Sequence, residues 1–284
     1  MDETIVRVEQ QSGDPLPVEG IDGRRLVAAW RFVAKTLAIA RMEVRKLRHD
    51  PMELVTRAIQ PLLWLLVFGQ VFGRLHTLPT GDLTYTEFLA PGILAQSVLF
   101  VAIFYGISVI WERDLGIVHK FLVSPTPRAA LVLGKAVSAG IRALSQAVIV
   151  YVASLALGVR LNLTPHALLG VLFFIMTGAA LFATFSLIIA SLVKTRERFM
   201  GIGQVLTMPL FFASNAIYPT AIMPDWLKWI VGVNPLTYEV DGLRALMLKG
   251  GASSLGLGVD ALVLTGALVL LVAAGAWLYP RIIV

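Results

Sequence analysis

The stretch that decides the fold is Trp111–Lys135, WERDLGIVHKFLVSPTPRAALVLGK, a charged segment between two long apolar runs. The run before it, residues 88–110, carries no charged residue, and the run after it, residues 136–158, carries only Arg142. A polar segment between two membrane spans lies at a membrane surface, and basic residues favour the cytoplasmic surface. We therefore expect two membrane-spanning helices joined by a cytoplasmic loop.

The loop itself has a helical pattern. Ile117, Val118, Phe121 and Leu122 fall on one face at helical spacing, and Pro125 ends the pattern. This predicts a short amphipathic helix joined rigidly to both spans, so that a partner pushing on it would tilt them. A solvated loop that only orients the spans is the alternative, and the residues leave both interpretations open.

The same loop resembles the first cytoplasmic loop of ABC-2 type transporter permeases. The matching positions are Glu112, Arg113, Asp114, Gly116, Ser124, Pro125, Arg128, Gly134 and Lys135. The chain departs from the family pattern at Ile117, where threonine is usual, and at Asp114, where glutamate is common. The resemblance implies a coupling helix over 111–128 that docks on a separate ATPase subunit. It assigns the contact to Glu112, Arg113, Asp114, Gly116, His119, Lys120 and Phe121.

Composition places the chain in a membrane. Of its 284 residues, 57% are hydrophobic and 15% are charged, and six stretches reach the roughly 20 apolar residues that cross a bilayer. We expect an all-α polytopic membrane protein with six transmembrane helices. The expected spans are about 52–72, with Pro61 kinking the helix, 88–110, 136–158, 167–193, 199–217 and 259–279.

Charge and cysteine content exclude several classes. The net charge is +6, but the basic residues lie on loops expected to face the cytoplasm, so we expect membrane-lipid contacts and no nucleic acid. Their distribution puts both termini in the cytoplasm of a multi-pass plasma (inner) membrane protein. Cysteine is absent, which excludes disulfides, thiolate metal sites and cysteine nucleophiles.

Three regions follow from the pattern along the chain. Residues 1–23 are acidic and polar, which predicts a disordered lead without a signal peptide. Residues 24–50 alternate apolar and basic positions, which favours an amphipathic helix in the membrane interface over a packed or coiled-coil helix. Residues 51–284 form the six-span domain.

The segment 218–258 is too apolar for a free loop. It breaks at Asn234-Pro235, which predicts two short helices forming a re-entrant hairpin between the last two spans, with Trp226 and Trp229 at the headgroup level.

This segment carries a second resemblance, to the C-terminal signature of ABC-2 permeases of the daunorubicin-resistance and nodulation type. The matching positions are Tyr218, Pro219, Pro224, Trp226, Leu227, Asn234, Pro235, Leu236, Thr237, Tyr238, Asp241, Leu243 and Arg244. It implies external re-entrant helices over 219–250 that close the outer end of the pathway. The expected gate residues are Pro219, Trp226, Asn234, Pro235, Tyr238, Glu239, Asp241 and Arg244. Ion pairs among Glu239, Asp241 and Arg244 would hold this gate, and ordinary surface charge is the alternative.

The chain lacks its own energy source. A phosphate-binding loop has the form GxxxxGK[ST], whereas Gly134-Lys135 lacks the preceding glycine and the following hydroxyl. We expect no catalytic residue and no bound cofactor, with ATP and Mg on the partner ATPase. His49, His76, His119 and His166 lack metal-ligand spacing.

The family resemblance places the substrate pathway on spans two and five at a homodimer interface. Aromatic, methionine and isolated polar side chains there suit an amphipathic molecule. The expected pathway residues are Gln96, Ser97, Phe100, Phe104, Met208, Phe211, Phe212 and Asn215. Plain helix–helix packing is the alternative for each.

These observations predict the permease subunit of an ATP-driven exporter, assembled from two permease and two ATPase chains. It would move an amphipathic drug, lipid or glycolipid out of the cytoplasm or inner leaflet. A polysaccharide or O-antigen-type export permease shares these features. An ATP-independent channel or carrier is disfavoured because no chain of carboxylates crosses the spans, and an intramembrane enzyme because no nucleophile or acid–base pair is clustered there.

Overall fold

The computed structural model describes residues 51–75, 79–115, 128–193 and 195–278. The predicted disordered lead and interfacial helix, and residues 116–127 of the coupling segment, lie outside these ranges. The described part is all helical, and its one strand-like pairing is an isolated bridge between Leu161 and Leu248. The elements are α2 (Pro51–Leu63), η1 (Trp64–Phe68), α3 (Gly69–Leu75), α4 (Tyr85–Asp114), α6 (Arg128–Ala156), α7 (Pro165–Leu192), α8 (Arg196–Phe212), η2 (Thr220–Ile222), α9 (Asp225–Val233), α10 (Pro235–Met247) and α11 (Leu257–Leu278).

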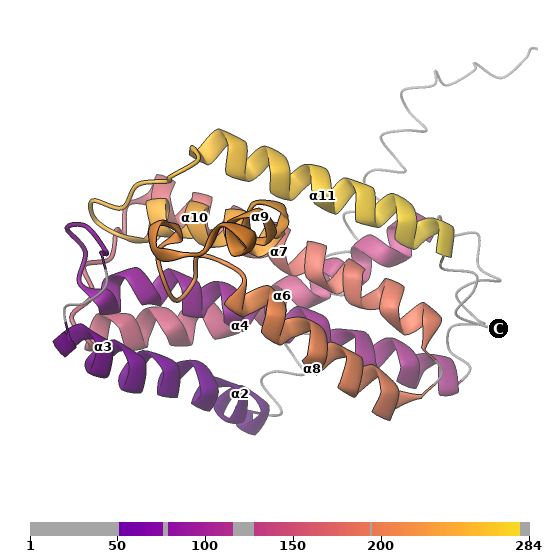
Figure 1. Cartoon of the computed structure of the whole chain (residues 1–284). Helices are drawn as coiled ribbons and strands as arrows, with labels where there is room; N and C mark the ends of the chain where they lie inside the picture. Colours follow the sequence, from indigo (N-terminus) through magenta and orange to yellow (C-terminus); the bar gives the residue numbers. More distant parts are fainter. Residues whose placement is uncertain (1–50, 76–78, 116–127, 194, 279–284) are drawn as a thin grey trace, which may run out of the picture.

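The long helices run side by side as a bundle (Figure 1). Within the described ranges, four helices are long and apolar enough to cross a membrane: α4, α6, α7 and α11. The apolar stretch Ala58–Arg74 in α2–η1–α3 is shorter, and α8 has 17 residues. Four of the six predicted spans therefore coincide with helices of spanning length.

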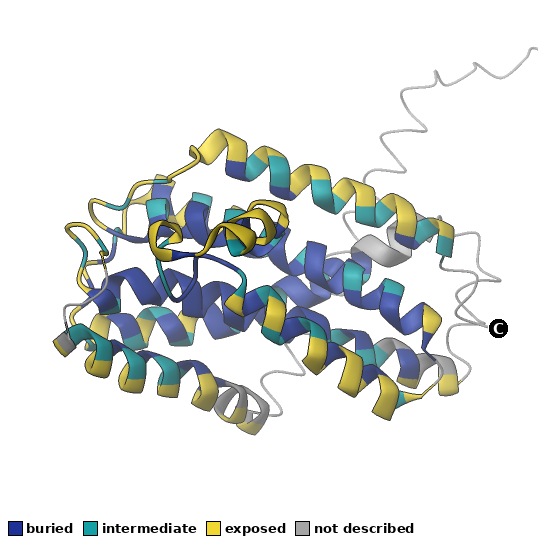
Figure 2. Cartoon of the chain, viewed as in Figure 1, coloured by how far each residue is buried: buried dark blue, intermediate teal, exposed yellow. Residues whose placement is uncertain are grey.

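Helix α4 is the centre of the bundle. It contacts α6, α7, α8 and α10, and most of its residues are buried (Figure 2). Helix α11 packs on α7 and α10 at the periphery and exposes Leu262, Leu270 and Trp277. Because lipid tails are as apolar as these side chains, such an exposed face is expected in a membrane and unusual in water.

The first helical stretch is irregular where the sequence predicted a kink. Pro61 lies inside α2, and the π-helical turn η1 follows three residues later. Trp64 stacks on Phe68 with ring centroids 4.3 Å apart, and Phe68 stacks on Phe72 at 5.7 Å. This aromatic row continues to Tyr85, so it fastens the first helical stretch to the start of α4.

Small residues let the backbones approach closely. A Cβ placed on Gly92 of α4 would lie 2.3 Å from the carbonyl oxygen of Ala216. A Cβ on Gly106 would lie 2.0 Å from Ser186 Oγ on α7 and 2.8 Å from the Phe199 ring on α8. These contacts require glycine, as is common where membrane helices pack tightly.

The helix of the predicted fifth span ends earlier than expected. Helix α8 ends at Phe212, and the chain that follows, Ser214–Ile217, is buried but not helical. The cause is tertiary: the Asn234 side chain binds the carbonyls of Leu210 and Ala213, and Ala216 lies against α4. The next predicted break is confirmed, since α9 and α10 meet at Asn234-Pro235.

Candidate functional site

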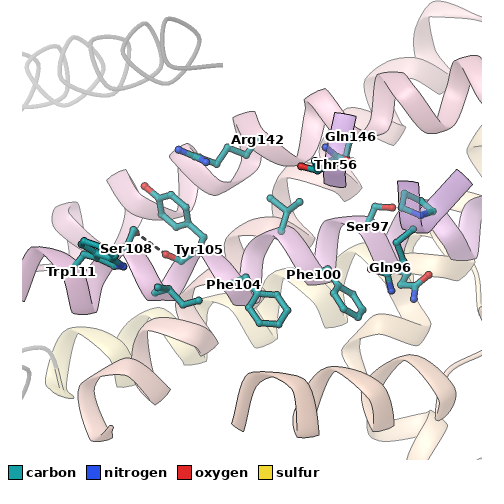
Figure 3. Close-up of a pocket in the computed structure, with 14 residues that line it drawn as sticks. Thr56, Gln96, Ser97, Phe100, Phe104, Tyr105, Ser108, Trp111, Arg142 and Gln146 are labelled. Atoms are coloured by element: carbon teal, nitrogen blue, oxygen red, sulfur yellow. Dashed lines mark hydrogen bonds between the residues drawn. The ribbon is translucent and has the colours of Figure 1, made fainter. Parts of the chain in front are cut away.

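A cavity of about 770 Å3 lies between α2, α4 and α6, and we call it the α2–α4–α6 cavity. Its lining residues are Thr56, Gln60, Pro61, Gln96, Ser97, Phe100, Val101, Phe104, Tyr105, Ile107, Ser108, Trp111, Arg142 and Gln146 (Figure 3). All four pathway residues predicted on the second span are therefore brought together here, whereas the predicted residues of the fifth span lie elsewhere.

Helix α4 presents two neighbouring stripes to this cavity. Residues four apart share a helix face, so Gln96, Phe100 and Phe104 form one stripe, and the ring centroids of the two phenylalanines are 6.0 Å apart. Tyr105 belongs to the second stripe, and the Arg142 guanidinium carbon lies 5.5 Å from its ring centroid. Figure 3 shows Phe100 and Phe104 pointing away from the helix that carries Arg142. The cavity thus has an aromatic side and a cationic side.

Two buried amides lie on this lining. Gln96 and Gln146 are each 2% exposed. Nε2 of both side chains, and Oε1 of Gln146, have no hydrogen-bond partner among the described residues. A buried amide without a partner is unfavourable, so a polar atom of a molecule in the cavity would be stabilised here.

The four residues predicted on the fifth span occupy other environments. Phe211 is buried and packs edge-on against Trp64, with ring centroids 5.7 Å apart. Phe212 lines a separate cavity of about 590 Å3 beside α9. Met208 is half-buried on α8, and Asn215 lies beyond the end of that helix. Within one protomer, these side chains and the α4 stripes do not share a cavity.

Asn234 organises the predicted outer gate. Its Oδ1 accepts from the Leu236 N–H at 3.0 Å and caps α10. Its Nδ2 donates to the carbonyl of Leu210 at 2.7 Å and to that of Ala213, the first residue after α8, at 2.6 Å. Pro235 occupies the first turn of α10, where its fixed φ suits a helix. One side chain therefore joins the end of α8 to the junction of α9 and α10.

The charged gate residues take separate partners. Asp241 accepts hydrogen bonds from the Ser254 N–H at 2.8 Å and from the Ser253 hydroxyl at 3.0 Å. Arg244 donates to the Asn215 carbonyl at 2.7 Å. Glu239 is buried, and neither carboxyl oxygen has a hydrogen-bond partner among the described residues. The ion pairs expected among Glu239, Asp241 and Arg244 are not found in this part of the chain.

The remaining predicted gate residues lie near the surface. Trp226 is exposed, Pro219 is half-buried, and the Tyr238 hydroxyl donates to the Gly232 carbonyl at 2.6 Å. The Glu239 carboxyl, by contrast, lies in the space that a Cβ on Gly178 of α7 would occupy. This burial raises the pKa of Glu239 well above its ordinary range.

Comparison with known proteins assigns the chain to a family. The family model "ABC-2 type transporter" matches residues 34–248, a stretch that includes every helix from α2 to α10. The chain belongs to the ABC-2 type transporter family.

Two of the three relatives described below are named as permeases. It is 28% identical to the transport permease ycf38 of Cyanophora paradoxa, over 78% of this chain and 76% of that protein. It is 27% identical to the daunorubicin resistance ABC transporter permease protein DrrB1 of Streptomyces coeruleorubidus, over 76% and 75%. It is 27% identical to nodulation protein J of Bradyrhizobium diazoefficiens, over 68% and 72%.

The described part of the predicted coupling region in this ABC-2 permease is the end of α4. Glu112, Arg113 and Asp114 belong to its last turn, whereas Gly116, His119, Lys120 and Phe121 lie outside the described residues. Asp114 pairs with Arg196 at 2.8 Å, and the Arg196 guanidinium carbon lies 3.6 Å from the Trp111 ring centroid. The end of α4 is therefore fastened to the start of α8.

An ion pair that was not predicted from the sequence joins Glu87 and Arg160. Arg160 Nε donates to Glu87 Oε1 at 2.7 Å and joins α4 to the connection between α6 and α7. The carboxylate raises the pKa of Arg160. A sequence signal existed, because Thr84-x-x-Glu87 has the form of a capping box, and the Thr84 N–H indeed donates to Glu87 Oε2 at 2.9 Å.

The ABC-2 permease shows no sign of a metal centre in its described part. Among residues 51–75, 79–115, 128–193 and 195–278, no group of three or more His, Asp or Glu side chains is placed to hold an ion. The lining of the α2–α4–α6 cavity is suited to binding, because it combines one cation, three amides, several hydroxyls and aromatic rings.

Proposed function

We propose that this chain is the membrane subunit of an ATP-driven exporter that moves an amphipathic substrate out of the cytoplasm or the inner leaflet. Membership of the ABC-2 family supports an ATPase partner, because such permeases in general work with one. Amphipathic substrates of this kind include drugs, lipids and glycolipids.

The observation that carries the proposal is the α2–α4–α6 cavity. Its volume of about 770 Å3 falls in the range of sites for drug-sized ligands. It lies within an apolar bundle, yet polar groups and aromatic rings share its lining. A molecule with both polar and apolar parts fits this lining better than a hydrated ion or a wholly apolar one.

In this proposal the chain crosses the membrane six times. The run α2–η1–α3 continues from Pro51 to Leu75, about 37 Å at 1.5 Å per residue, and would serve as the first span. Helix α8 would be the fifth span, completed by the buried segment Ser214–Ile217. Non-helical backbone is tolerated at membrane depth when protein buries it. Both termini would then face the cytoplasm.

The energy would enter at the inner end of α4. In our proposal two copies of the chain pair, and one ATPase subunit docks below each copy at the segment over 111–128. The Asp114–Arg196 ion pair supports transmission of this movement, because it connects α4 to α8 directly. Helices α9 and α10 would form the re-entrant outer closure, with Asn234 as their joint to α8.

Reconstitution tests this function. The full-length chain is purified from its native membrane with any ATPase that binds it, and is placed in vesicles alone, with that ATPase, or with an ATPase whose phosphate-loop lysine is changed. Transport of a fluorescent amphiphile should require the permease, the intact ATPase and ATP. Uphill transport by the permease alone would contradict the proposal, and transport of a labelled polysaccharide instead would favour the glycan-exporting alternative.

A further inference from the structure

We propose that the α2–α4–α6 cavity binds the anionic head group of an amphiphile, with Arg142 as the counter-charge and Gln96 and Gln146 as hydrogen-bonding partners. The inference rests on the proposed export function and narrows its substrate class. It assigns a role to two residues of α6, which sequence analysis did not place on the pathway.

The charges of the lining residues favour a negatively charged ligand. Arg142 is the one charged side chain among the cavity's described lining residues, which include no carboxylate. It lies eight residues inside the apolar segment that begins at Gly134, about 12 Å along the helix axis. A cation at such a depth is expensive unless it faces protein or water, and it marks a route for substrates or ions. A guanidinium has five N–H donors, so Arg142 can keep its other contacts and still bind a negative group of a molecule in the cavity.

The geometry of α6 carries the second step. Gln146 follows Arg142 by four residues, so both side chains project from one face of the helix into the same cavity. A guanidinium binds phosphate or carboxylate through two parallel hydrogen bonds. The Gln146 amide lies one helical turn away and has no partner in the part of the chain that the structure describes, so it can donate to the same anion or bind the polar group next to it.

Helix α4 supplies the rest of the site. The Gln96 Nε2, also without a partner among the described residues, can donate to a hydroxyl or carbonyl of the ligand. The Phe100 and Phe104 rings lie between the levels of Gln96 and Trp111 (Figure 3). These two end residues are about 22 Å apart along the helix. An apolar chain can therefore extend over the aromatic side while its head stays near Arg142.

Binding of two matched probes tests this inference without the ATPase. Both carry the same fluorescent dodecyl chain, one ending in phosphate and the other in trimethylammonium. The full-length chain is held in nanodiscs of zwitterionic lipid, and fluorescence anisotropy reports binding. We expect the phosphate probe to bind at least tenfold more tightly than the cationic probe.

Three variants locate the preference. Arg142→Gln should weaken binding of the phosphate probe at least tenfold. Lys249→Gln, an exposed control with the same change of charge, should leave this binding unchanged. Gln146→Leu should weaken it severalfold while leaving all charges in place, and it keeps the test valid if Arg142→Gln does not fold. Equal affinity of the two probes, or unchanged phosphate affinity in both cavity variants, would overturn the inference.

Native mass spectrometry of the purified chain separates two sources of the anion. A membrane phospholipid retained by the wild type and lost in Arg142→Gln would identify the head group as that of a bilayer lipid. Binding of the single-chain phosphate with no retained phospholipid would identify a free anionic amphiphile. Either result supports the site. ATP-driven transport of the cationic probe alone would reject the anionic preference and support the export function. Binding of the phosphate probe without ATP-driven transport of any probe would support the anionic site and contradict the export function.

Discussion

Replacing Asn234 should loosen the junction between α8, α9 and α10 more than any surface change on these helices. Asn234→Ala removes an N-cap worth about 1 kcal/mol and two donated hydrogen bonds of about 1 kcal/mol each. The loss of stability is then about 3 kcal/mol, or about 6 to 12 °C in the unfolding temperature at the 2–4 °C per kcal/mol typical of chains of 150–250 residues.

Asn234→Asp separates the two contributions. An aspartate retains the oxygen that caps α10, but it replaces the Nδ2 donor with an oxygen facing the carbonyls of Leu210 and Ala213. If the link to α8 dominates, Asn234→Asp should be at least as unstable as Asn234→Ala. If the cap alone matters, the aspartate variant should unfold like the wild type.

The assay follows tryptophan fluorescence of the detergent-purified chain during heating. Lys228→Ala is the matched control, since Lys228 lies on α9 and its pair with Asp225 is exposed, so that its loss should change stability by 1 kcal/mol at most. A wild-type unfolding temperature for Asn234→Asp, or a smaller effect of Asn234→Ala than of the control, would refute the reasoning.

Three further predictions concern other contacts. Gly92→Ala should destabilise the fold by about 1–3 kcal/mol, because its Cβ would meet backbone atoms. Gly201→Ala should stabilise the fold by up to about 1 kcal/mol, because nothing lies within 4 Å of its Cβ. Thermal unfolding of both variants checks this contrast. Burial raises the pKa of Glu239 above the unfolded value of 4.5, so the folded state holds a proton that the unfolded state releases. The free energy of unfolding should therefore fall by up to about 1.4 kcal/mol per pH unit as pH rises from 4.5 toward the folded pKa. Glu239→Gln should remove that slope in unfolding temperatures measured between pH 5 and 8, and parallel curves for the two proteins would count against it. Reversing the charge of Asp114 or Arg196 alone should lower ATP-dependent transport with at most about 1 kcal/mol lost in stability, and exchanging both should restore transport.

The positions of the helices were largely predictable from the sequence. Long apolar runs predict where α4, α7 and α11 lie to within a few residues, because hydrophobic length is a one-dimensional property. Helix α6 begins at Arg128, eight residues before its predicted span. The break between α9 and α10 was equally readable, since Pro235 lacks the N–H that a continuing helix needs and Asn234 is a favoured cap.

Contacts between distant segments were not predictable in this way. Helix α8 ends early because Asn234, more than twenty residues later, takes the carbonyls of its last turn. The partner of Glu87 is Arg160, 73 residues away, although the local capping box was visible. In the sequence Arg142 is only a single charge within an apolar run, and it is the packing of α6 beside α4 that places it on the cavity with Tyr105.

The contact of Gly92 with the Ala216 carbonyl limits how this bundle can rearrange. A translation of α4 by one helical turn in either direction would bring Phe88 or Gln96 to the position of the glycine, and either side chain would collide with the carbonyl. Sliding of α4 along its own axis past Ala216 is therefore blocked near the end of the helix that begins at Tyr85. A tilt of α4 relative to Ala216 would pivot about this contact, so its opposite end, near Trp111, would sweep the widest arc.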